Sequence, residues 1–206
     1  MCDFPNVENN DFELDALGSI CDDWSRRIAS LQAMFDQGFQ DEALVLCGCY
    51  IEAIGRWLFK SDPSGEEAFA KALVCHGGNE VFSRINPKRL MEFLRRDRDA
   101  DRHIISALSE AFAGFQDGFH PFPEIISVCE SALSDEPFVP VDEIFWPGTL
   151  ACAAYRITRC EGIQNGSVEV KDYEGAVLDF EVFHPALKRI FEKARAMVVA
   201  GRLRIY

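Results

Sequence analysis

The residues of this chain whose types and spacing could form a chemical site are Arg159 and Gln164, which flank a predicted helix end. Apolar residues at helical spacing precede Arg159, and Gly162 follows it, so we expect the helix to stop between the two polar residues. On a continuous helix, residues five apart are separated by roughly 140° and do not converge. A break at Gly162 would let both side chains converge. The alternative is that Arg159 only complements the negative C-terminus of its helix.

A second pair, Arg98 and His103, has similar spacing within the charged run 95–102. Histidine exchanges a proton near neutral pH, so this pair could serve as an acid–base site. The surrounding residues favour a structural interpretation instead. Asp99 or Asp101 is predicted to cap the helix that follows, with the neighbouring arginines as solvated partners of these aspartates.

Glu52 and Arg56 are charged residues on an otherwise apolar helix predicted over 42–59. They are four positions apart and therefore share one face of that helix. An unpaired buried charge is costly, so we expect the two side chains to pair. Two interpretations stay open: an internal ion pair that stabilises helix packing, or a polar cleft wall in which Glu52 lies beside Arg159.

Several segments of the chain resemble the HEPN superfamily, a group of small all-helical domains that includes ribonucleases. Segment 50–56, Tyr-Ile-Glu-Ala-Ile-Gly-Arg, is similar to the helix of these domains that combines apolar residues with a carboxylate. Segment 146–159 resembles the helix that leads to the family's Arg-x4-6-His motif, and the helix after residue 178 resembles the closing helix. The resemblance spans roughly residues 12–60 and 140–200.

The resemblance implies a specific chemistry for the motif. In active members the arginine holds the scissile phosphate, the histidine acts as acid or base, and an RNA 2′-hydroxyl attacks. No metal or other cofactor takes part, and two protomers bring their motifs together, which implies a homodimer here. Carried over, Arg159 takes a phosphate or anion role. This chain has Gln164 at the histidine position, and an amide cannot transfer a proton, so Gln164 has at most an orienting role.

Two functions are therefore predicted. The first is a HEPN-like protein, catalytically weak or inactive, that acts as an interaction or ligand-binding module in a toxin–antitoxin or phage-defence setting. The alternative is a metal-independent endoribonuclease that uses Arg98 and His103, or Arg159 with a base from elsewhere. The candidate site residues are Arg159, Gln164, Glu52 and His103.

Charge and cysteine content narrow the classes of function. A net charge of −13 over 206 residues weakens any general nucleic-acid binding, which depends on Lys and Arg contacts to phosphates, but leaves room for a small basic cleft. Among the eight cysteines only Cys47 and Cys49 are close, and on a helix they point to different faces, so we expect no metal site.

Scattered thiols and the lack of a signal-peptide pattern predict a cytoplasmic protein. No apolar run approaches the ~20 residues of a membrane span.

Helical periodicity dominates the chain and predicts an all-α helical bundle. Its base is an antiparallel helix pair over 12–37 and 42–59, against which a last helix over 180–200 packs. Helix starts are predicted at residues with capping side chains or nearby prolines: Asp11, Asp41, Ser64, Asn86, Pro121, Trp146 and Asp179. The Gly-containing segment 162–175 would suit one short β-hairpin.

The length of the chain suits a single domain, predicted over 11–206 after a flexible tail at 1–10. Segment 61–135 matches no part of the HEPN pattern and is interpreted as a helical insertion. A chain of this size can bury about 70% of its unfolded surface, so we expect a stable core without disulfides.

Overall fold

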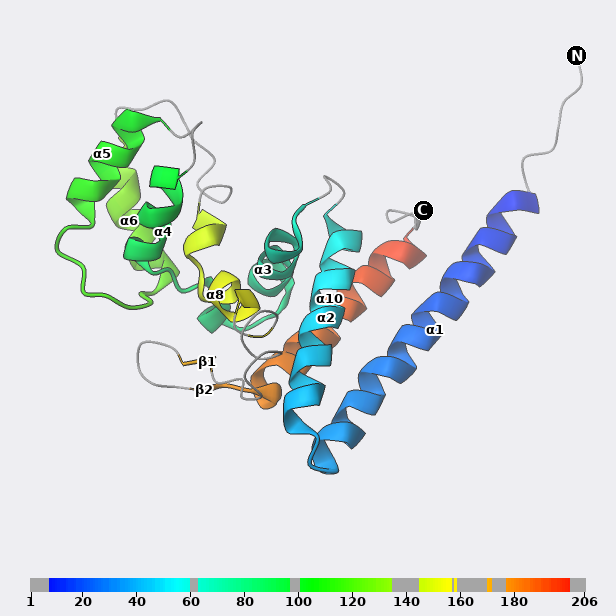
Figure 1. Ribbon diagram of the computed structural model, residues 1–206. Helices are drawn as coiled ribbons and strands as arrows, with labels where there is room; N and C mark the ends of the chain where they lie inside the picture. Colours follow the sequence, from blue (N-terminus) through cyan, green and yellow to red (C-terminus); the bar gives the residue numbers. More distant parts are fainter. Residues whose placement is uncertain are drawn as a thin grey trace, which may run out of the picture.

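The computed structural model of the protein describes residues 8–59, 63–96, 101–134, 145–156, 158, 170–171 and 177–200 (Figure 1). Helices make up most of this part of the chain, which confirms the predicted all-α class. The α-helices are α1 (Glu8–Asp36), α2 (Gln40–Leu58), α3 (Gly65–His76), α4 (Pro87–Arg96), α5 (Arg102–Ala111), α6 (Phe122–Ala132), α8 (Leu150–Arg156) and α10 (Phe180–Val199). Two short 3-10 turns are η1 (Glu80–Ser83) and η2 (Trp146–Gly148).

One short β-hairpin interrupts the helices, as the sequence predicted. β1 (Val170–Lys171) pairs antiparallel with β2 (Val177–Leu178), and Val170 lies opposite Leu178. Leu178 is buried in the larger hydrophobic core, so the hairpin is tied to the start of α10. The second strand lies C-terminal to the predicted segment 162–175, most of which is outside the described residues.

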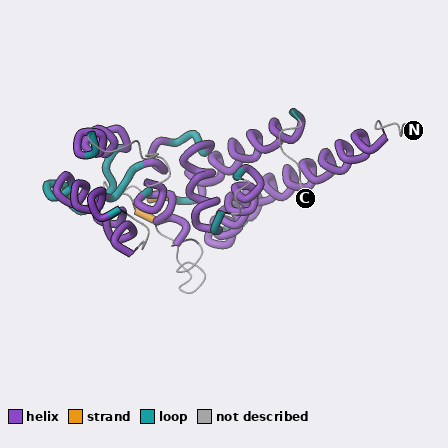
Figure 2. The backbone as a smooth tube through the Cα atoms, turned by 90° about the horizontal axis from the view of Figure 1, so that it is seen from above, coloured by secondary structure: helices purple, strands orange, loops and turns teal. Residues whose placement is uncertain are grey.

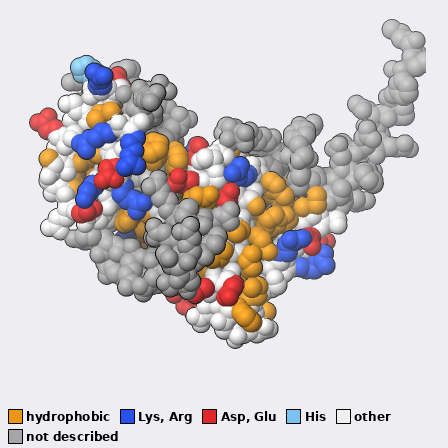
Figure 3. All heavy atoms as spheres, viewed as in Figure 1, with side chains coloured by type: hydrophobic (Ala, Val, Ile, Leu, Met, Phe, Trp, Pro, Cys, Tyr) orange, Lys and Arg blue, Asp and Glu red, His pale blue; other side chains and the backbone are white. Residues whose placement is uncertain are grey.

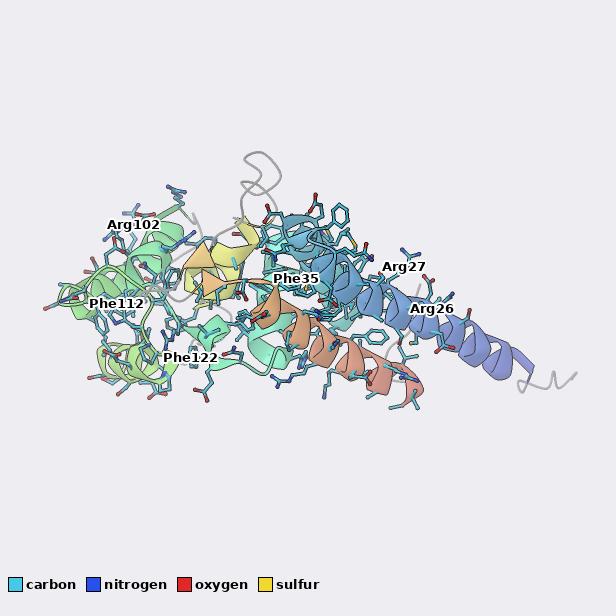
Figure 4. The ribbon with its side chains drawn as sticks, turned by 90° about the horizontal axis from the view of Figure 1, so that it is seen from below. Arg26, Arg27, Phe35, Arg102, Phe112 and Phe122 are labelled. Carbon is cyan, nitrogen blue, oxygen red and sulfur yellow. The ribbon has the colours of Figure 1, made fainter. Side chains whose placement is uncertain are left out.

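The described residues form two hydrophobic cores, and the larger one lies among α1, α2, α3, α8 and α10. α2 is its central helix and packs against α1, α3 and α10. α1 and α2 form the predicted antiparallel pair, and α10 packs against both (Figure 1). Phe35 of α1, which Figure 4 labels, stacks on Phe180 of α10 with ring centroids 4.6 Å apart. The N-terminal half of α1 extends beyond the other helices in both backbone views (Figures 1 and 2).

α2 and α3 approach each other closely because Gly55 lies at their crossing. A methyl group at Gly55 would clash with the carbonyl oxygen of Ala68 and would lie 3.3 Å from the Cβ atom of Ala72. Small residues on both helices therefore let the two backbones come together. The same crossing places the start of α3 beside the middle of α2, where Glu52 lies.

α4, α5 and α6 surround a second, smaller hydrophobic core. Leu90, Leu108 and Ile125, one from each helix, are completely buried in it. Figure 4 shows Phe112 and Phe122 in this cluster, at the end of the molecule far from the N-terminus of α1. The smaller cluster is thus a separate packing unit beside the main bundle.

The segment predicted as an insertion, 61–135, is divided between the two cores. α3 packs against α2 and α8 and contributes Phe69 and Leu73 to the larger core. The smaller core begins with Ile85 and also includes Phe145, which lies beyond the predicted segment. The boundaries of the smaller cluster therefore follow side-chain packing rather than the limits of the family pattern.

A short extended segment before α4 joins the two clusters through backbone hydrogen bonds. The Ile85 N–H donates to the His120 carbonyl oxygen at 2.9 Å, and the His120 N–H donates back at 2.8 Å. The Leu150 N–H donates to the carbonyl oxygen of Arg84 at 2.8 Å. These bonds attach α4 and α6 of the smaller cluster to the start of α8 in the larger one.

Several predicted helix starts are confirmed, because each capping side chain accepts a hydrogen bond from a backbone N–H in the first turn. These side chains belong to Ser64 before α3, Asn86 before α4, Asp101 before α5 and Asp179 before α10. Pro121 precedes α6 as predicted. Gly38 follows α1 with a φ of 92°, a left-handed conformation that favours glycine and ends the helix.

Two predicted starts in the first helix pair are wrong. α1 begins at Glu8 rather than after Asp11, so residues 8–10 of the predicted tail belong to the helix, and residues 1–7 lie outside the described residues. α2 begins at Gln40, with no side-chain hydrogen bond at its cap. Asp41 therefore lies inside the first turn, where the partial positive charge of the helix end favours a carboxylate without requiring a cap.

The predicted helix start at Trp146 is also wrong. Trp146, Pro147 and Gly148 form η2, a separate 3-10 turn, and α8 begins only at Leu150. The Thr149 side chain accepts a hydrogen bond from the Cys152 N–H at 3.2 Å and so satisfies a donor in the first turn of α8.

Candidate functional site

Polar side chains from three helices converge where α2, α3 and α8 meet. Glu52 comes from the middle of α2, and Gly65 and Glu66 form the first turn of α3. Cys152 and Tyr155 come from α8, where residues three apart share one face. These five residues are called the polar cluster below.

Glu52 forms the ion pair with Arg56 that the spacing predicted. The Arg56 Nη2 atom lies 3.3 Å from Glu52 Oε1, and the two side chains are 46% and 13% exposed, respectively. The carboxylate is therefore largely covered while its partner reaches solvent. This geometry fits the structural interpretation, in which the pair stabilises packing around α2. The other interpretation places Glu52 beside Arg159, which lies outside the described residues.

Glu52 and Tyr155 both reach the first residue of α3. A methyl group at Gly65 would clash with Glu52 Oε1 and would lie 2.7 Å from the hydroxyl oxygen of Tyr155. Glycine at this position thus leaves room for both oxygens. The N-terminal end of a helix carries partial positive charge, so the carboxylate of Glu52 is favoured here.

A hydrogen bond between Cys152 and Glu66 fastens α8 to the start of α3. The Cys152 thiol donates to Glu66 Oε1 at a sulfur–oxygen distance of 3.0 Å. Cys152 is completely buried, whereas Glu66 is half-buried. The bond links α8 to the residue that follows Gly65, and these two side chains complete the polar cluster.

Thr158 is the described residue that comes directly before the predicted motif. It is buried, and its hydroxyl donates to the Ala154 carbonyl oxygen at 2.9 Å. A methyl group at Gly48 of α2 would lie 3.5 Å from this hydroxyl oxygen, so Thr158 packs closely on α2. Arg159 follows directly in the sequence. Arg159 and Gln164 both lie outside the described residues, and their roles stay predictions.

The alternative histidine, His103, lies in the smaller cluster. It is exposed in the first turn of α5, and its backbone N–H donates to the Asp101 side chain at 2.8 Å. Glu52 belongs to α2 of the larger cluster, and α8 lies between α5 and α2 in Figure 1. The structure therefore does not bring His103 together with Glu52. Arg98, the predicted partner of His103, is outside the described residues.

The other three of the chain's four histidines have partners elsewhere. His120 and His184 each place a ring nitrogen within 3.2 Å of a backbone carbonyl oxygen. His76 ends α3, at the opposite end of that helix from Gly65, and its ring stacks on Phe59. None of the four imidazoles belongs to the polar cluster.

Sequence reasoning missed most of the polar cluster. Cys152 and Tyr155 are three residues apart on the helix that was predicted to lead to Arg159, so they share one face of it. That spacing could have indicated both residues from the sequence. The capping pattern at Ser64 also placed Glu66 in a first turn. Neither signal could show that this particular helix start meets this particular helix.

The polar cluster offers hydrogen-bonding groups rather than an acid–base pair built on imidazole. Its described groups are two carboxylates, a phenol and a thiol, with the Arg56 cation at the solvent side. Such a set can orient a polar ligand or a neighbouring backbone. Within the described ranges, no group of three or more His, Cys, Asp and Glu side chains could hold a metal ion.

Comparisons with known proteins add no relative of this chain. No protein-family model, curated protein or solved structure matches it. Among the helices that the structure describes, none is both long enough and apolar enough to cross a bilayer.

Proposed function

We propose that this chain is a HEPN-like domain that acts as an interaction or ligand-binding module and is catalytically weak or inactive. The resemblance of segments 50–56 and 146–159 supports this proposal and suggests a homodimer with a protein partner in a cytoplasmic toxin–antitoxin or phage-defence setting. The helices α2 and α8, which carry these two segments, both contribute to the polar cluster. If Glu52 lies beside Arg159, as the cleft-wall interpretation predicts, a ligand held by Arg159 would be bordered by Glu52.

One observation carries the proposal: the chain has no histidine at the motif position where the family chemistry requires one. Gln164 occupies the histidine position of the motif, and none of the four histidines lies in the polar cluster. Loss of a general acid or base typically removes ~10²–10⁴ in rate. A site that retains the arginine but lacks the imidazole is suited to holding a phosphate or an acidic partner rather than to cleaving RNA.

The test is an RNA-cleavage assay in the presence of EDTA with the variant Gln164→His. If Arg159 holds the phosphate and only the proton-transfer group is missing, the new imidazole should raise cleavage by about 10²-fold or more over wild type. The gain should be largest near the imidazole pKa, in the slightly acidic to neutral range. Adding Arg159→Ala to Gln164→His should abolish it.

The controls separate a missing proton-transfer group from a site of another kind. His103→Ala should leave the cleavage by Gln164→His unchanged, because His103 lies in the other cluster. If Gln164→His folds as wild type does, by circular dichroism, and remains inert toward RNA, a ribonuclease function at this motif is contradicted and the binding-module function stands.

The alternative, a metal-independent endoribonuclease, rests on the exposure of His103 at the start of α5. In that case wild-type protein cleaves RNA in EDTA, and His103→Ala removes the activity if Arg98 and His103 form the site, whereas Arg159→Ala removes it if Arg159 acts with a base from elsewhere. The same assay thus decides between the two functions.

A further inference from the structure

Positive charge is concentrated on α4, in the smaller cluster. This ten-residue helix has Lys88, Arg89, Arg95 and Arg96 against a single carboxylate, Glu92, whereas the whole chain has a net charge of −13. Figure 3 shows Lys and Arg side chains gathered over the smaller cluster. A local excess of cations on an acidic protein marks a surface on which an anionic ligand can bind.

Two of these cations flank an aromatic ring on one helix face. Arg89, Phe93 and Arg96 are spaced by four and three residues, so they follow one another along the same face. Phe93 is 36% exposed. Neither arginine forms an ion pair with another residue in the described part of the chain. The seven-residue separation puts the two arginine positions roughly 10 Å apart along the helix axis.

A cavity of about 360 Å³ lies along this face. Its lining includes both arginines, Phe93, Lys88 and Pro147. That volume falls in the ~300–1,000 Å³ range of ligand sites. The cavity therefore has room for a flat group against the Phe93 ring, with the Arg89 and Arg96 guanidinium groups also in its lining.

The Phe93 ring is held in place by the turn that precedes α8. It meets Trp146 of η2 edge-on, with ring centroids 5.9 Å apart. A methyl group at Gly148 would lie 2.8 Å from the Leu90 Cβ atom, so η2 and α4 pack too closely for a side chain there. The exposed aromatic is thus a fixed platform rather than a loose surface side chain.

Carboxylates at the cavity distinguish between anionic ligands. Glu92 lines it, and so does Asp117, which accepts from the Lys88 ammonium at 3.1 Å and from the Asn86 amide at 3.1 Å. An acidic peptide would be disfavoured, because its own carboxylates would lie near those of Glu92 and Asp117 and would be repelled. Nucleobases have exocyclic amino groups that donate to carboxylates and flat faces that stack on aromatic rings.

We propose that the α4 face formed by Arg89, Phe93 and Arg96, with Lys88 at its edge, binds single-stranded nucleic acid. The two guanidinium groups contact backbone phosphates, and one base stacks on Phe93. At 3.4 Å per nucleotide of a stacked strand, the ~10 Å between the arginine positions spans about three nucleotides. This site is separate from Arg159 and Gln164 and goes beyond the proposed function.

The test measures fluorescence anisotropy of a labelled single-stranded DNA of about ten nucleotides on titration with the full chain. DNA lacks the 2′-hydroxyl that family cleavage would need, so the result does not depend on the proposed function. The double variant Arg89→Gln/Arg96→Gln should weaken binding at least about tenfold. With two phosphate contacts, log K should fall with log salt with a slope of about −1.4 in the wild type.

The matched control is Lys188→Gln/Arg195→Gln on α10. These two exposed cations have the same seven-residue spacing, and the control changes the net charge by the same amount. Glu192 occupies the position that Phe93 has on α4, and the neighbouring Phe191 is buried in the larger core, so no exposed aromatic ring lies between the two cations. Binding should change by less than about twofold, as expected for charges outside the contact. Phe93→Ala should weaken binding about fivefold or more without changing the salt slope, and Phe93→Tyr should retain it because its ring still stacks.

Four outcomes would overturn the proposal. They are no saturable binding, equal affinity of Arg89→Gln/Arg96→Gln and wild type, binding of polyglutamate as tight as that of the oligonucleotide, and competition by AMP as strong as by the oligonucleotide. The third would make the face a protein-docking surface, and the fourth would make it a mononucleotide site.

Discussion

At the scale of single residues, the larger core buries an imidazole among apolar neighbours. His184 is 3% exposed, and its ring stacks on Phe180 with centroids 4.7 Å apart. Burial lowers the pKa of His184 below its ordinary value; the hydrogen bond to Ile28 opposes this shift, and the nearby Lys188 adds to it. The pKa of His76 is lowered as well, first by burial and then by Lys193. Both groups link protonation to folding.

The sign of this linkage gives a prediction for acid stability. As pH falls below the ordinary histidine pKa of about 6.5, the unfolded chain takes up protons that the folded protein resists. The contribution of His184 to stability is therefore complete above about pH 6.5 and is lost as pH falls toward its lowered folded-state pKa. Melting temperature measured from neutral pH down to about pH 5 should decrease, and His184→Gln should flatten that decrease.

The control is His103→Gln, which replaces an exposed histidine on α5 and should retain the wild-type pH profile. The comparison uses the slope of melting temperature against pH, so a general loss of stability in His184→Gln does not obscure it. An unchanged slope in that variant would contradict a buried neutral imidazole.

At the scale of elements, the crossing of α2 and α3 determines where the polar cluster forms. Because Gly55 has no side chain, the Ala68 backbone can approach α2 closely. That approach places Gly65 beside the Glu52 carboxylate and the Tyr155 hydroxyl. The spacing of carboxylate and phenol thus depends on a contact made by Gly55, ten residues before Gly65 in the sequence. Helix packing, rather than local sequence, aligns the two polar oxygens.

Gly55→Ala should therefore destabilise the protein. The new methyl group meets a carbonyl oxygen of a packed helix, and overpacking of this kind costs about 1–3 kcal/mol. The matched control is Gly18→Ala in α1, where nothing lies within 4 Å of the added methyl group. Because alanine is the better helix former, Gly18→Ala should stabilise by up to about 1 kcal/mol. Urea unfolding of both variants checks the opposite signs; stabilisation by Gly55→Ala would refute the close crossing.

At the scale of the whole molecule, the two proposed binding surfaces lie in different packing units. The larger cluster holds the segments that resemble HEPN domains, and the smaller cluster displays the basic face of α4. The long α1 extends past the bundle at the opposite end from α4–α6 (Figures 1 and 2). The arrangement separates the two proposed binding surfaces.

The proposed homodimer gives the prediction for this scale. Each protomer has a single Arg159 followed by the Gly-containing segment 162–175, and two-fold pairing would bring two such segments together. Light scattering should give twice the monomer mass of 23.2 kDa at micromolar concentration. A mass that stays at the monomer value up to high micromolar concentration would count against pairing and against a site completed by a partner protomer.

The sequence by itself determined the helical class, the antiparallel pair with its packed closing helix, and the caps at Ser64, Asn86 and Asp179. Those features depend on periodicity or on hydrogen bonds within one turn, so nearby residues suffice to specify them. The Glu52–Arg56 pair was predictable for the same reason, because both residues lie on one face of one helix.

Only the tertiary structure decided which polar groups meet and where the second cluster begins. The Cys152–Glu66 hydrogen bond joins residues 86 positions apart, and it exists because α8 and the start of α3 are brought together by packing in the larger core. The platform of Phe93 likewise needs Trp146 from a distant turn. Contacts between distant segments depend on how whole helices cross, and that crossing is determined by the fit of many buried side chains at once.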